Sequence, residues 1–288
     1  MAARRIVVAG GSGFLGSKIC KSAVARGWSV TSLSRSGEPQ WDTVSGFREP
    51  PEWAGLVEWA KADVLKPNTY KGYLKDAAAV IYSMGILLEA DYKNVVQGRE
   101  SLVGGLLRAF SSSQLGSQNP LQKNKGEELK DTERNAQWTY ELMNRDSAIA
   151  LAQECSHEHI PTFVYISAAA GAPILPSRYI TTKRDAEAVI SSMFPEMRTI
   201  LVRPPFMYDT NRKFTLPIAL GGIIGSQLNT LLGGRLEFMG TMTEKPLRVD
   251  LVGEAVVEAI SDDAISGVVG TKNIDSLATK AWRRSMLL

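Results

Sequence analysis

Short apolar runs alternate with amphipathic stretches along most of the chain. Runs rich in β-branched side chains are typical of buried strands, and spacings of three and four residues are typical of helices. The predicted strands are residues 6–9, 29–34, 56–62, 78–83, 162–167 and 199–203. The predicted helices are residues 14–26, 140–155 and 178–193. This alternation predicts βαβ units, and therefore an α/β fold with a doubly wound parallel sheet.

Two stretches depart from this alternation. Residues 111–137 contain only four aliphatic side chains, too few to bury a core, so we expect a polar surface insertion. That insertion is either a plain loop or a segment that docks a partner or covers a site. Residues 216–232 are the most apolar stretch, yet polar residues interrupt them and they are too short to cross a bilayer. We expect a buried or ligand-facing helix there, with a lipid-facing helix as the alternative.

Composition excludes several classes of protein. Lys and Arg number 33 against 30 Asp and Glu, a net charge of +3, which is too small an excess for a nucleic-acid binder. Cys20 and Cys155 are the only cysteines, and His157 and His159 the only histidines, so neither a disulfide scaffold nor a metal site is expected. Residues 1–5 precede the first strand, too few for a secretory signal or an ordinary transit peptide.

A glycine-rich turn joins the first strand to the first helix. It reads Gly10-Gly11-Ser12-Gly13-Phe14-Leu15-Gly16. Gly10 permits a tight turn, Gly13 allows a diphosphate to approach the backbone, and Gly16 allows close packing of the helix. The N–H groups and dipole of the helix favour negative charge at this point. The turn therefore predicts a dinucleotide site, with a purely structural turn as the alternative.

The end of the second strand indicates which dinucleotide binds. It reads Ser34-Arg35-Ser36 and lacks the carboxylate that would accept a ribose 2′-hydroxyl. Arg35, flanked by two hydroxyls, suits a 2′-phosphate, so NADP(H) is favoured over NAD(H). Asp63-Val64, after the third strand, is placed to meet the adenine, although Asp63 could instead cap a helix.

Four polar residues form a candidate catalytic group. Tyr179 and Lys183 lie four apart on one predicted helix face. An ammonium beside a phenol favours the phenolate, which would suit Tyr179 for acid–base work. Ser167 ends the fifth strand, where its hydroxyl could orient a substrate oxygen, and Asn144 on the preceding helix could support the network.

With these motifs the chain resembles the extended or atypical branch of the short-chain dehydrogenase/reductase superfamily. The resemblance runs from residue 5 to about residue 260. Besides the motifs above, it includes Arg203-Pro204 after the sixth strand and Val249-Asp250 before a late helix. It implies a Rossmann sheet and cofactor contacts from the glycine turn, Met84, Gly85, Tyr179, Lys183 and Pro204.

Longer segments resemble one subfamily, the fungal mitochondrial coenzyme Q biosynthesis proteins, which are related to the NADPH-binding accessory subunit of complex I. These segments are residues 13–16, 34–37, 83–89, 119–121, 140–144, 165–168 and 203–209. The resemblance implies a peripheral location on the matrix side of the inner membrane, with other coenzyme Q biosynthesis proteins as partners. In this branch NADPH can be held without turnover, and Tyr179 and Lys183 then hold only its ribose.

These observations define the expected organisation and three hypotheses. Residues 1–203 would form the dinucleotide-binding domain, and residues 204–288 a substrate lobe of which about 246–270 return to the sheet. The favoured hypothesis is an NADP(H)-dependent oxidoreductase acting on a quinone or lipid-like intermediate. The alternative is a non-catalytic, NADPH-bound subunit of the coenzyme Q complex. A nucleotide-sugar enzyme is disfavoured, because residues 214–240 are mostly apolar.

Overall fold

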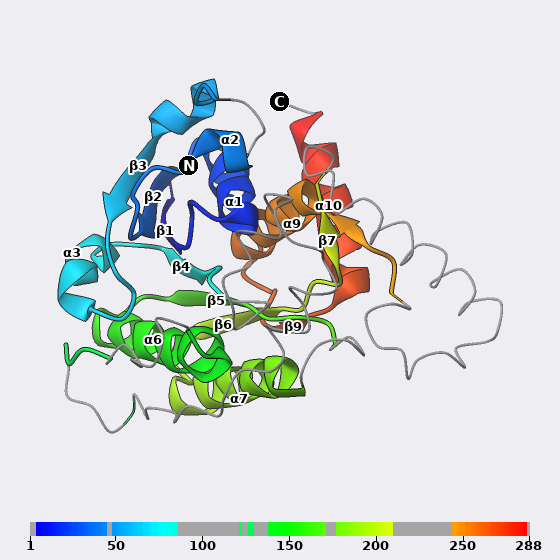
Figure 1. Ribbon diagram of the computed structural model, residues 1–288. Coiled ribbons are helices and arrows are strands. Elements are labelled where there is room, and N and C mark those ends of the chain that lie inside the picture. The colour runs from blue at the N-terminus through cyan, green and yellow to red at the C-terminus, as the bar shows by residue number, and fades with distance from the viewer. Residues whose placement is uncertain are drawn as a thin grey trace, which may run out of the picture.

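The computed structural model describes residues 4–44, 48–85, 121, 126–129, 138–170, 177–209 and 244–286. A parallel sheet lies between two layers of helices (Figure 1). Its strands are β1 (Arg5–Ala9), β2 (Ser29–Ser34), β3 (Val57–Lys61), β4 (Ala79–Tyr82), β5 (Thr162–Ile166), β6 (Arg198–Val202) and β9 (Gly267–Val269). The longer helices are α1 (Phe14–Val24), α6 (Ser147–His157), α7 (Ser177–Met193), α9 (Val249–Ser261) and α10 (Thr271–Ser285).

Short elements complete the described chain. The helices of one turn are α2 (Trp41–Val44) and α3 (Lys71–Leu74), with 3₁₀ turns at Glu52–Leu56 and Pro67–Thr69. Strands β7 (Met207–Tyr208) and β8 (Leu247–Arg248) pair in parallel. None of the helices among the described residues is long and apolar enough to cross a bilayer.

The strand order confirms the predicted doubly wound α/β fold. The order is β3-β2-β1-β4-β5-β6-β9, with every pair parallel. The direction in which strands are added reverses between β1 and β4, and in sheets of this kind ligands bind at the carboxyl ends of the strands at such a switch point. All six predicted strands form within a residue of their expected bounds. The pattern did not predict β9, because three residues that begin with a glycine give no periodic signal.

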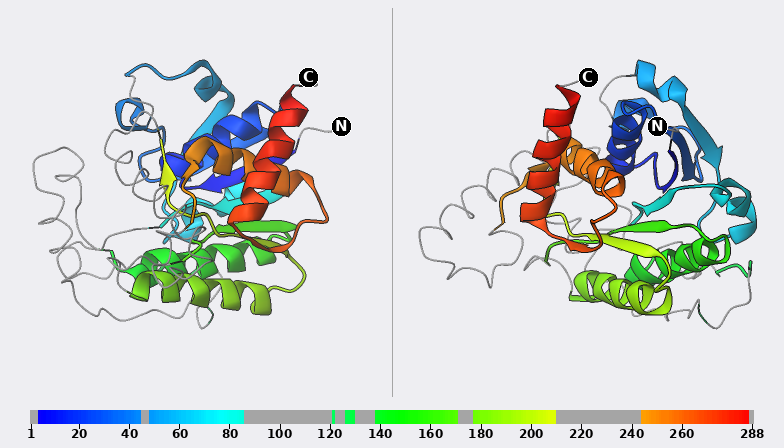
Figure 2. Two further views of the ribbon diagram at one scale, coloured as in Figure 1. Left: turned by 90° about the vertical axis from the view of Figure 1, so that its right-hand side faces the viewer. Right: turned by 180° about the vertical axis from the view of Figure 1, so that it is seen from behind.

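Both faces of the sheet are covered, which explains the continuous apolar runs. Ile6 and Val8 of β1 pack with α1, α9 and α10, whereas Val7 and Ala9 face the layer of α6 and α7. The two views in Figure 2 show the same layers, with α10 lying beside α9. Alternate residues of one strand therefore belong to two separate cores, and neither face can be polar.

The predicted helix 140–155 contains a π-helical segment, Glu141–Asp146, that continues into α6. A π turn removes ordinary hydrogen bonds from backbone carbonyls, which then need other donors. The buried hydroxyl of Tyr82 donates to the carbonyl of Met143, and that of Tyr165 donates to the carbonyl of Asn144. The two tyrosine rings stack with their centroids 5.8 Å apart. Side chains at the ends of β4 and β5 therefore position this segment.

A fully buried carboxylate joins the helices on the other face. Glu258 of α9 has no exposed surface, and its oxygens lie 2.6 Å from Arg26 Nη2, 3.6 Å from Lys280 Nζ and 3.1 Å from Arg284 Nη2. Arg26 follows α1, whereas the other two cations belong to α10. One buried charge thus connects the first helix of the chain with the last two.

Parts of the predicted organisation lie outside the described residues. The apolar stretch 216–232 does so entirely, and the polar insertion 111–137 does so except for residues 121 and 126–129. The division into domains at residue 203 stays a prediction. In the described part of the second region, α9 packs against α1, and β9 extends the sheet beside β6.

Candidate functional site

The glycine turn follows β1, at the switch point between β1 and β4, and is shaped by steric contacts. Gly10 has a φ of +85°, and its N–H donates to the carbonyl of Leu33 at 2.8 Å. A Cβ at Gly10 would lie 2.7 Å from Met84 Cγ, and one at Gly16 only 2.1 Å from the carbonyl oxygen of Gly10. Gly16 is therefore required because any side chain at this position in α1 would clash with the backbone of the turn that precedes the helix.

The start of α1 fits the diphosphate of a dinucleotide. Gly13 occupies the N-cap position and no side chain caps the helix there. The first turn of α1 contains no acidic residue, and Gly13 itself is exposed. A Cβ at Gly13 would meet only the carbonyl oxygen of Gly10, at 3.1 Å. The N–H of Gly13 donates to the carbonyl of Gly10 at 2.9 Å, so the backbone N–H groups of the first turn of α1 after Gly13 are those placed to bind an anion.

Arg35 is exposed directly after β2 and stacks on an aromatic ring. Its Cζ lies 3.9 Å from the ring centroid of Trp138. The Ser34 hydroxyl donates to the carbonyl of Gly37 at 2.7 Å, so this serine closes the turn, while Ser36 is exposed. No local pattern connects Trp138 to Arg35, because the two are distant in the chain.

The Asp63-Val64 pair forms a turn. Asp63 Oδ1 accepts a hydrogen bond from the N–H of Leu65 at 3.1 Å, and the N–H of Asp63 donates to Thr69 Oγ1 at 2.9 Å. Val64 is buried. This geometry resembles the capping alternative, because the carboxylate binds backbone of its own turn.

The structure brings three predicted residues together at the end of β4 and β5. Lys183 Nζ donates to the carbonyl of Ile166 at 3.0 Å and lies 5.8 Å from the ring centroid of Tyr179. A Cβ built on Gly85 would lie 3.0 Å from Asn144 Oδ1 and 3.5 Å from Lys183 Nζ. Asn144 and Lys183, from different helices, therefore both reach the backbone that follows β4.

Burial moves the pKa values of the tyrosine and lysine. Lys183 is 4% exposed, and burial lowers its pKa to about 8, with Glu187 opposing this shift and Arg184 adding to it. Burial raises the pKa of Tyr179 to about 12, and Arg184 is the cation that opposes this. The expectation that the Lys183 ammonium would favour the phenolate is therefore not met. Tyr179 carries its proton at neutral pH, as a proton donor must.

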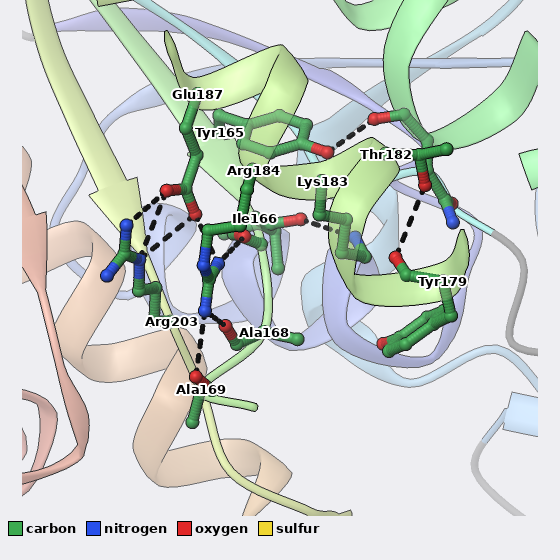
Figure 3. A network of polar contacts seen from close by, with 12 residues as sticks. Tyr165, Ile166, Ala168, Ala169, Tyr179, Thr182, Lys183, Arg184, Glu187 and Arg203 are labelled. Atoms are coloured by element: carbon green, nitrogen blue, oxygen red, sulfur yellow. Dashed lines mark hydrogen bonds and ion pairs between the residues drawn. The ribbon is translucent and has the colours of Figure 1, made fainter. Parts of the chain in front are cut away.

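Ser167 directly follows β5, and it bonds to Arg184, which belongs to a network that the sequence did not reveal. Figure 3 shows Arg184, Glu187 and Arg203 of this network. Arg184 Nη1 donates to Ser167 Oγ at 3.0 Å and to Glu187 Oε1 at 2.7 Å. Its Nη2 donates to the carbonyls of Ala168 and Ala169, each at 2.8 Å. Arg184, the residue after Lys183 on α7, thus holds the backbone that follows β5.

The carboxylate of Glu187 is shared with a second arginine. Arg203 Nε lies 3.1 Å from both oxygens of Glu187, and its Nη2 donates to Oε2. Glu187 is 3% exposed, so the two cations offset the cost of burying its charge. Pro204 accepts a hydrogen bond from the N–H of Ala169 at 2.8 Å. The helical spacing of Lys183 and Glu187 could have indicated a shared buried face, but not this pairing.

Comparison with known proteins identifies the family. Residues 6–96 match the model of the NAD dependent epimerase/dehydratase family. MIOREX complex component 2 of Saccharomyces cerevisiae (strain ATCC 204508 / S288c) is 32% identical over 289 residues, covering 94% of this chain and 98% of the yeast protein. The chain belongs to the NAD dependent epimerase/dehydratase family. Its predicted membership of the short-chain dehydrogenase/reductase superfamily is thereby confirmed.

A second relative and two solved structures extend this comparison. An uncharacterized chloroplastic protein of Arabidopsis thaliana is 26% identical over 288 residues, covering 96% of this chain and 78% of the plant protein. Among solved structures, UDP-glucuronic acid 4-epimerase from Bacillus cereus in complex with NAD has a TM-score of 0.52 at 17% identity, covering 92% of this chain and 77% of that one. Alfalfa vestitone reductase has a TM-score of 0.52 at 15% identity, covering 93% and 76%. At these identities the solved structures show a shared fold.

Replacing Gly16 by alanine should destabilise this epimerase/dehydratase-family chain. The new Cβ would lie 2.1 Å from a backbone oxygen, and overpacking of this kind costs about 1–3 kcal/mol or more. Urea denaturation would measure the loss. Gly72→Ala is the control, because its Cβ meets nothing within 4 Å. Equal stability of Gly16→Ala and the wild type would contradict this account of the turn.

The pKa of Lys183 predicts a rise in stability above pH 8. Between about pH 8 and 10.5 the unfolded chain binds a proton at this lysine that the folded chain has lost, so raising the pH favours folding. The free energy of unfolding should gain about 2 kcal/mol by about pH 9.5 through this residue. Urea titrations from pH 7 to about 9.5 would measure it.

Two variants isolate this effect. Lys183→Met should lack the rise, whereas Lys71→Met, which removes an exposed lysine on α3, should keep it. Identical pH dependence in the wild type and Lys183→Met would refute the assignment.

Proposed function

We propose that this chain is an NADP(H)-dependent oxidoreductase of mitochondrial ubiquinone biosynthesis, acting on a quinone or lipid-like intermediate. The observation that carries the proposal is the pair formed by Tyr179 and the buried Lys183, on a helix that reaches the same edge of the sheet as the glycine turn. Proton-bearing groups of shifted pKa beside a dinucleotide crevice are typical of redox sites.

In this proposal each residue has a defined task. The backbone of the first turn of α1, after Gly13, binds the diphosphate, and Lys183 together with Tyr179 binds the ribose next to the nicotinamide. When bound, a reduced nicotinamide supplies hydride. Tyr179, whose pKa of about 12 means that it carries its proton at neutral pH, donates that proton to the reacting oxygen. Ser167 orients that oxygen, and Asn144 supports Lys183 through the backbone at Gly85.

The choice of NADP(H) rests on Arg35. The match to the NAD dependent family and the NAD-bound epimerase support binding of a nicotinamide dinucleotide. The choice between NAD(H) and NADP(H) depends on this chain's own residues. Stacking on Trp138 holds the guanidinium in one plane, so its in-plane N–H groups can bind a 2′-phosphate with little further loss of freedom. Residues 34–37, directly at the end of β2, contain no carboxylate that could accept a 2′-hydroxyl in its place.

The proposed location and partners rest on sequence resemblance. The segments shared with coenzyme Q biosynthesis proteins support the matrix side of the mitochondrial inner membrane, with peripheral attachment. Partners among the coenzyme Q biosynthesis proteins follow from the same resemblance. A protein partner is also supported by the yeast relative, which is a component of a complex.

The relative's membership of a complex also favours a second candidate function. The chain could be an NADPH-bound subunit that uses the dinucleotide for stability rather than for turnover. Binding of the dinucleotide to the folded state alone would stabilise the chain by mass action. In that case Tyr179 and Lys183 hold the ribose, and the polar insertion 111–137 contacts partner proteins.

Removing the guanidinium of Arg35 should change the selectivity for dinucleotides. Arg35→Ala should weaken NADPH binding about ten- to a hundredfold, the value of a charge-assisted contact, and leave NADH binding within about threefold. Fluorescence titration of the purified protein would give both dissociation constants. Arg283→Ala removes an exposed arginine on α10 and should bind like the wild type. Equal losses for both dinucleotides in Arg35→Ala would contradict the proposed 2′-phosphate contact.

Turnover separates the two candidate functions. With NADPH and a short-chain prenylated quinone, absorbance at the reduced nicotinamide band should fall. Tyr179→Phe should slow this about a hundredfold or more while NADPH still binds. Tyr73→Phe, on α3, controls for the loss of a tyrosine hydroxyl elsewhere. NADPH binding without turnover in the wild type would favour the subunit, and no dinucleotide binding would refute both functions.

A further inference from the structure

Arg184 connects the middle of α7 with the segment that follows β5. Its two terminal nitrogens donate to four acceptors: the Ser167 hydroxyl, the carbonyls of Ala168 and Ala169, and the Glu187 carboxylate. The guanidinium is half-buried, and Figure 3 shows it lying between the Glu187 carboxylate and the Ala168 and Ala169 carbonyls. Its position one residue after Lys183 places it at the edge of the proposed catalytic group.

The direction of one hydrogen bond has a chemical consequence. Arginine can only donate, so Ser167 Oγ accepts from Arg184 and keeps its own proton for another acceptor. Among the residues that the structure describes, Arg184 is the only side chain that bonds to this hydroxyl. Ser167 is 4% exposed, so few other orientations are available to it. Its proton is thus directed toward whatever oxygen enters the site.

The guanidinium is itself held in place. Glu187 accepts from Arg184 and also pairs with Arg203, which follows β6. The planar fork of an arginine between a carboxylate and two carbonyls has little rotational freedom. Arg203 carries the same charge in the same cluster but bonds to neither Ser167 nor the backbone at Ala168 and Ala169. It therefore provides a matched comparison.

We propose that Arg184 is a positioning residue for the reaction, which holds Ser167 Oγ as an acceptor so that the serine proton faces the oxygen of a carbonyl or quinone substrate. This inference rests on the proposed oxidoreductase function. The positive charge beside Oγ also makes the serine a stronger hydrogen-bond donor.

A second effect of the same guanidinium supports the proposal. Burial raises the pKa of Tyr179 to about 12, and the charge of Arg184 opposes this rise. Arg184 therefore acts on both groups that would bind the reacting oxygen, through a hydrogen bond to the serine and through its charge on the tyrosine. Lys183, with its lowered pKa, is the weaker cation of the two near neutral pH.

The variant Ser167→Cys would report how close the Arg184 guanidinium lies to position 167, and it would do so without any dinucleotide or substrate. In Ser167→Cys the thiolate would lie beside Arg184, and absorbance of the thiolate during a pH titration gives the thiol pKa. The two native cysteines are fully buried, and burial raises their pKa values, so they would not contribute. The charged groups nearest the reporter are Arg184, Glu187 and Lys183 on α7 and Arg203 after β6.

The expected result is a selective shift. Adding Arg184→Met to the reporter should raise the thiol pKa by about one unit or more, a tenfold smaller thiolate fraction at a given pH. Adding Arg203→Met should raise it less. Arg184→Lys, which keeps the charge and is the milder change for folding, should give an intermediate value. Equal shifts from Arg184→Met and Arg203→Met, or no shift in either Arg184 variant, would overturn the proposal.

Turnover tests the functional half of the proposal. In otherwise unmodified protein, Arg184→Met should lower kcat for NADPH oxidation by the prenylated quinone about ten- to a hundredfold and leave the Kd for NADPH within about threefold. Arg203→Met should lower kcat less. An unchanged kcat in Arg184→Met would overturn the positioning role. NADPH binding without turnover in the wild type, together with the expected pKa shift in the Ser167→Cys proteins, would refute the oxidoreductase function while keeping the placement of Ser167.

Discussion

The arrangement of the site depends on one buried carboxylate. Glu187 is almost fully removed from water, and an unpaired charge in such a place would be too costly to keep. Arg184 on the same helix and Arg203 after β6 both bind it. Because Glu187 and Arg184 lie on α7 and Arg203 follows a strand, the ion pair between Glu187 and Arg203 fixes the rotation of α7 relative to the sheet. Lys183 and Tyr179 are carried on that helix, so their positions follow from the same constraint.

Much of the fold could be predicted from the sequence, because burial on both faces leaves a continuous apolar signature in each parallel strand. The glycine turn could be predicted for a similar reason, since a close approach of backbone permits only one residue type. Interactions between distant segments left no such signature. Neither the stacking of Arg35 on Trp138 nor the pairing of Glu187 with Arg203 follows from local spacing. The π-helical segment was equally hidden, as it depends on hydroxyls from β4 and β5.

The candidate site shows how environment changes the meaning of a motif. A tyrosine and a lysine four residues apart suggest a lysine that acidifies the tyrosine. In the folded chain the lysine binds a backbone carbonyl. Desolvation raises the pKa of the tyrosine and lowers the pKa of the lysine, so it favours the neutral form of both groups. The sequence specifies which groups are present, but their proton affinity depends on how much water and which charges the fold leaves around them.

The cluster around Glu258 has a consequence for how the molecule is made. Its carboxylate lies between Arg26, which follows the first helix, and two cations of α10, close to the end of the described chain. During synthesis the first βαβ unit emerges long before α9 and α10, the helices that cover it. That face of the sheet is covered by α1 alone until α9 and α10 have been made. Folding of the first βαβ unit is therefore completed only once these two late helices have emerged, and its apolar face needs protection from aggregation in the meantime.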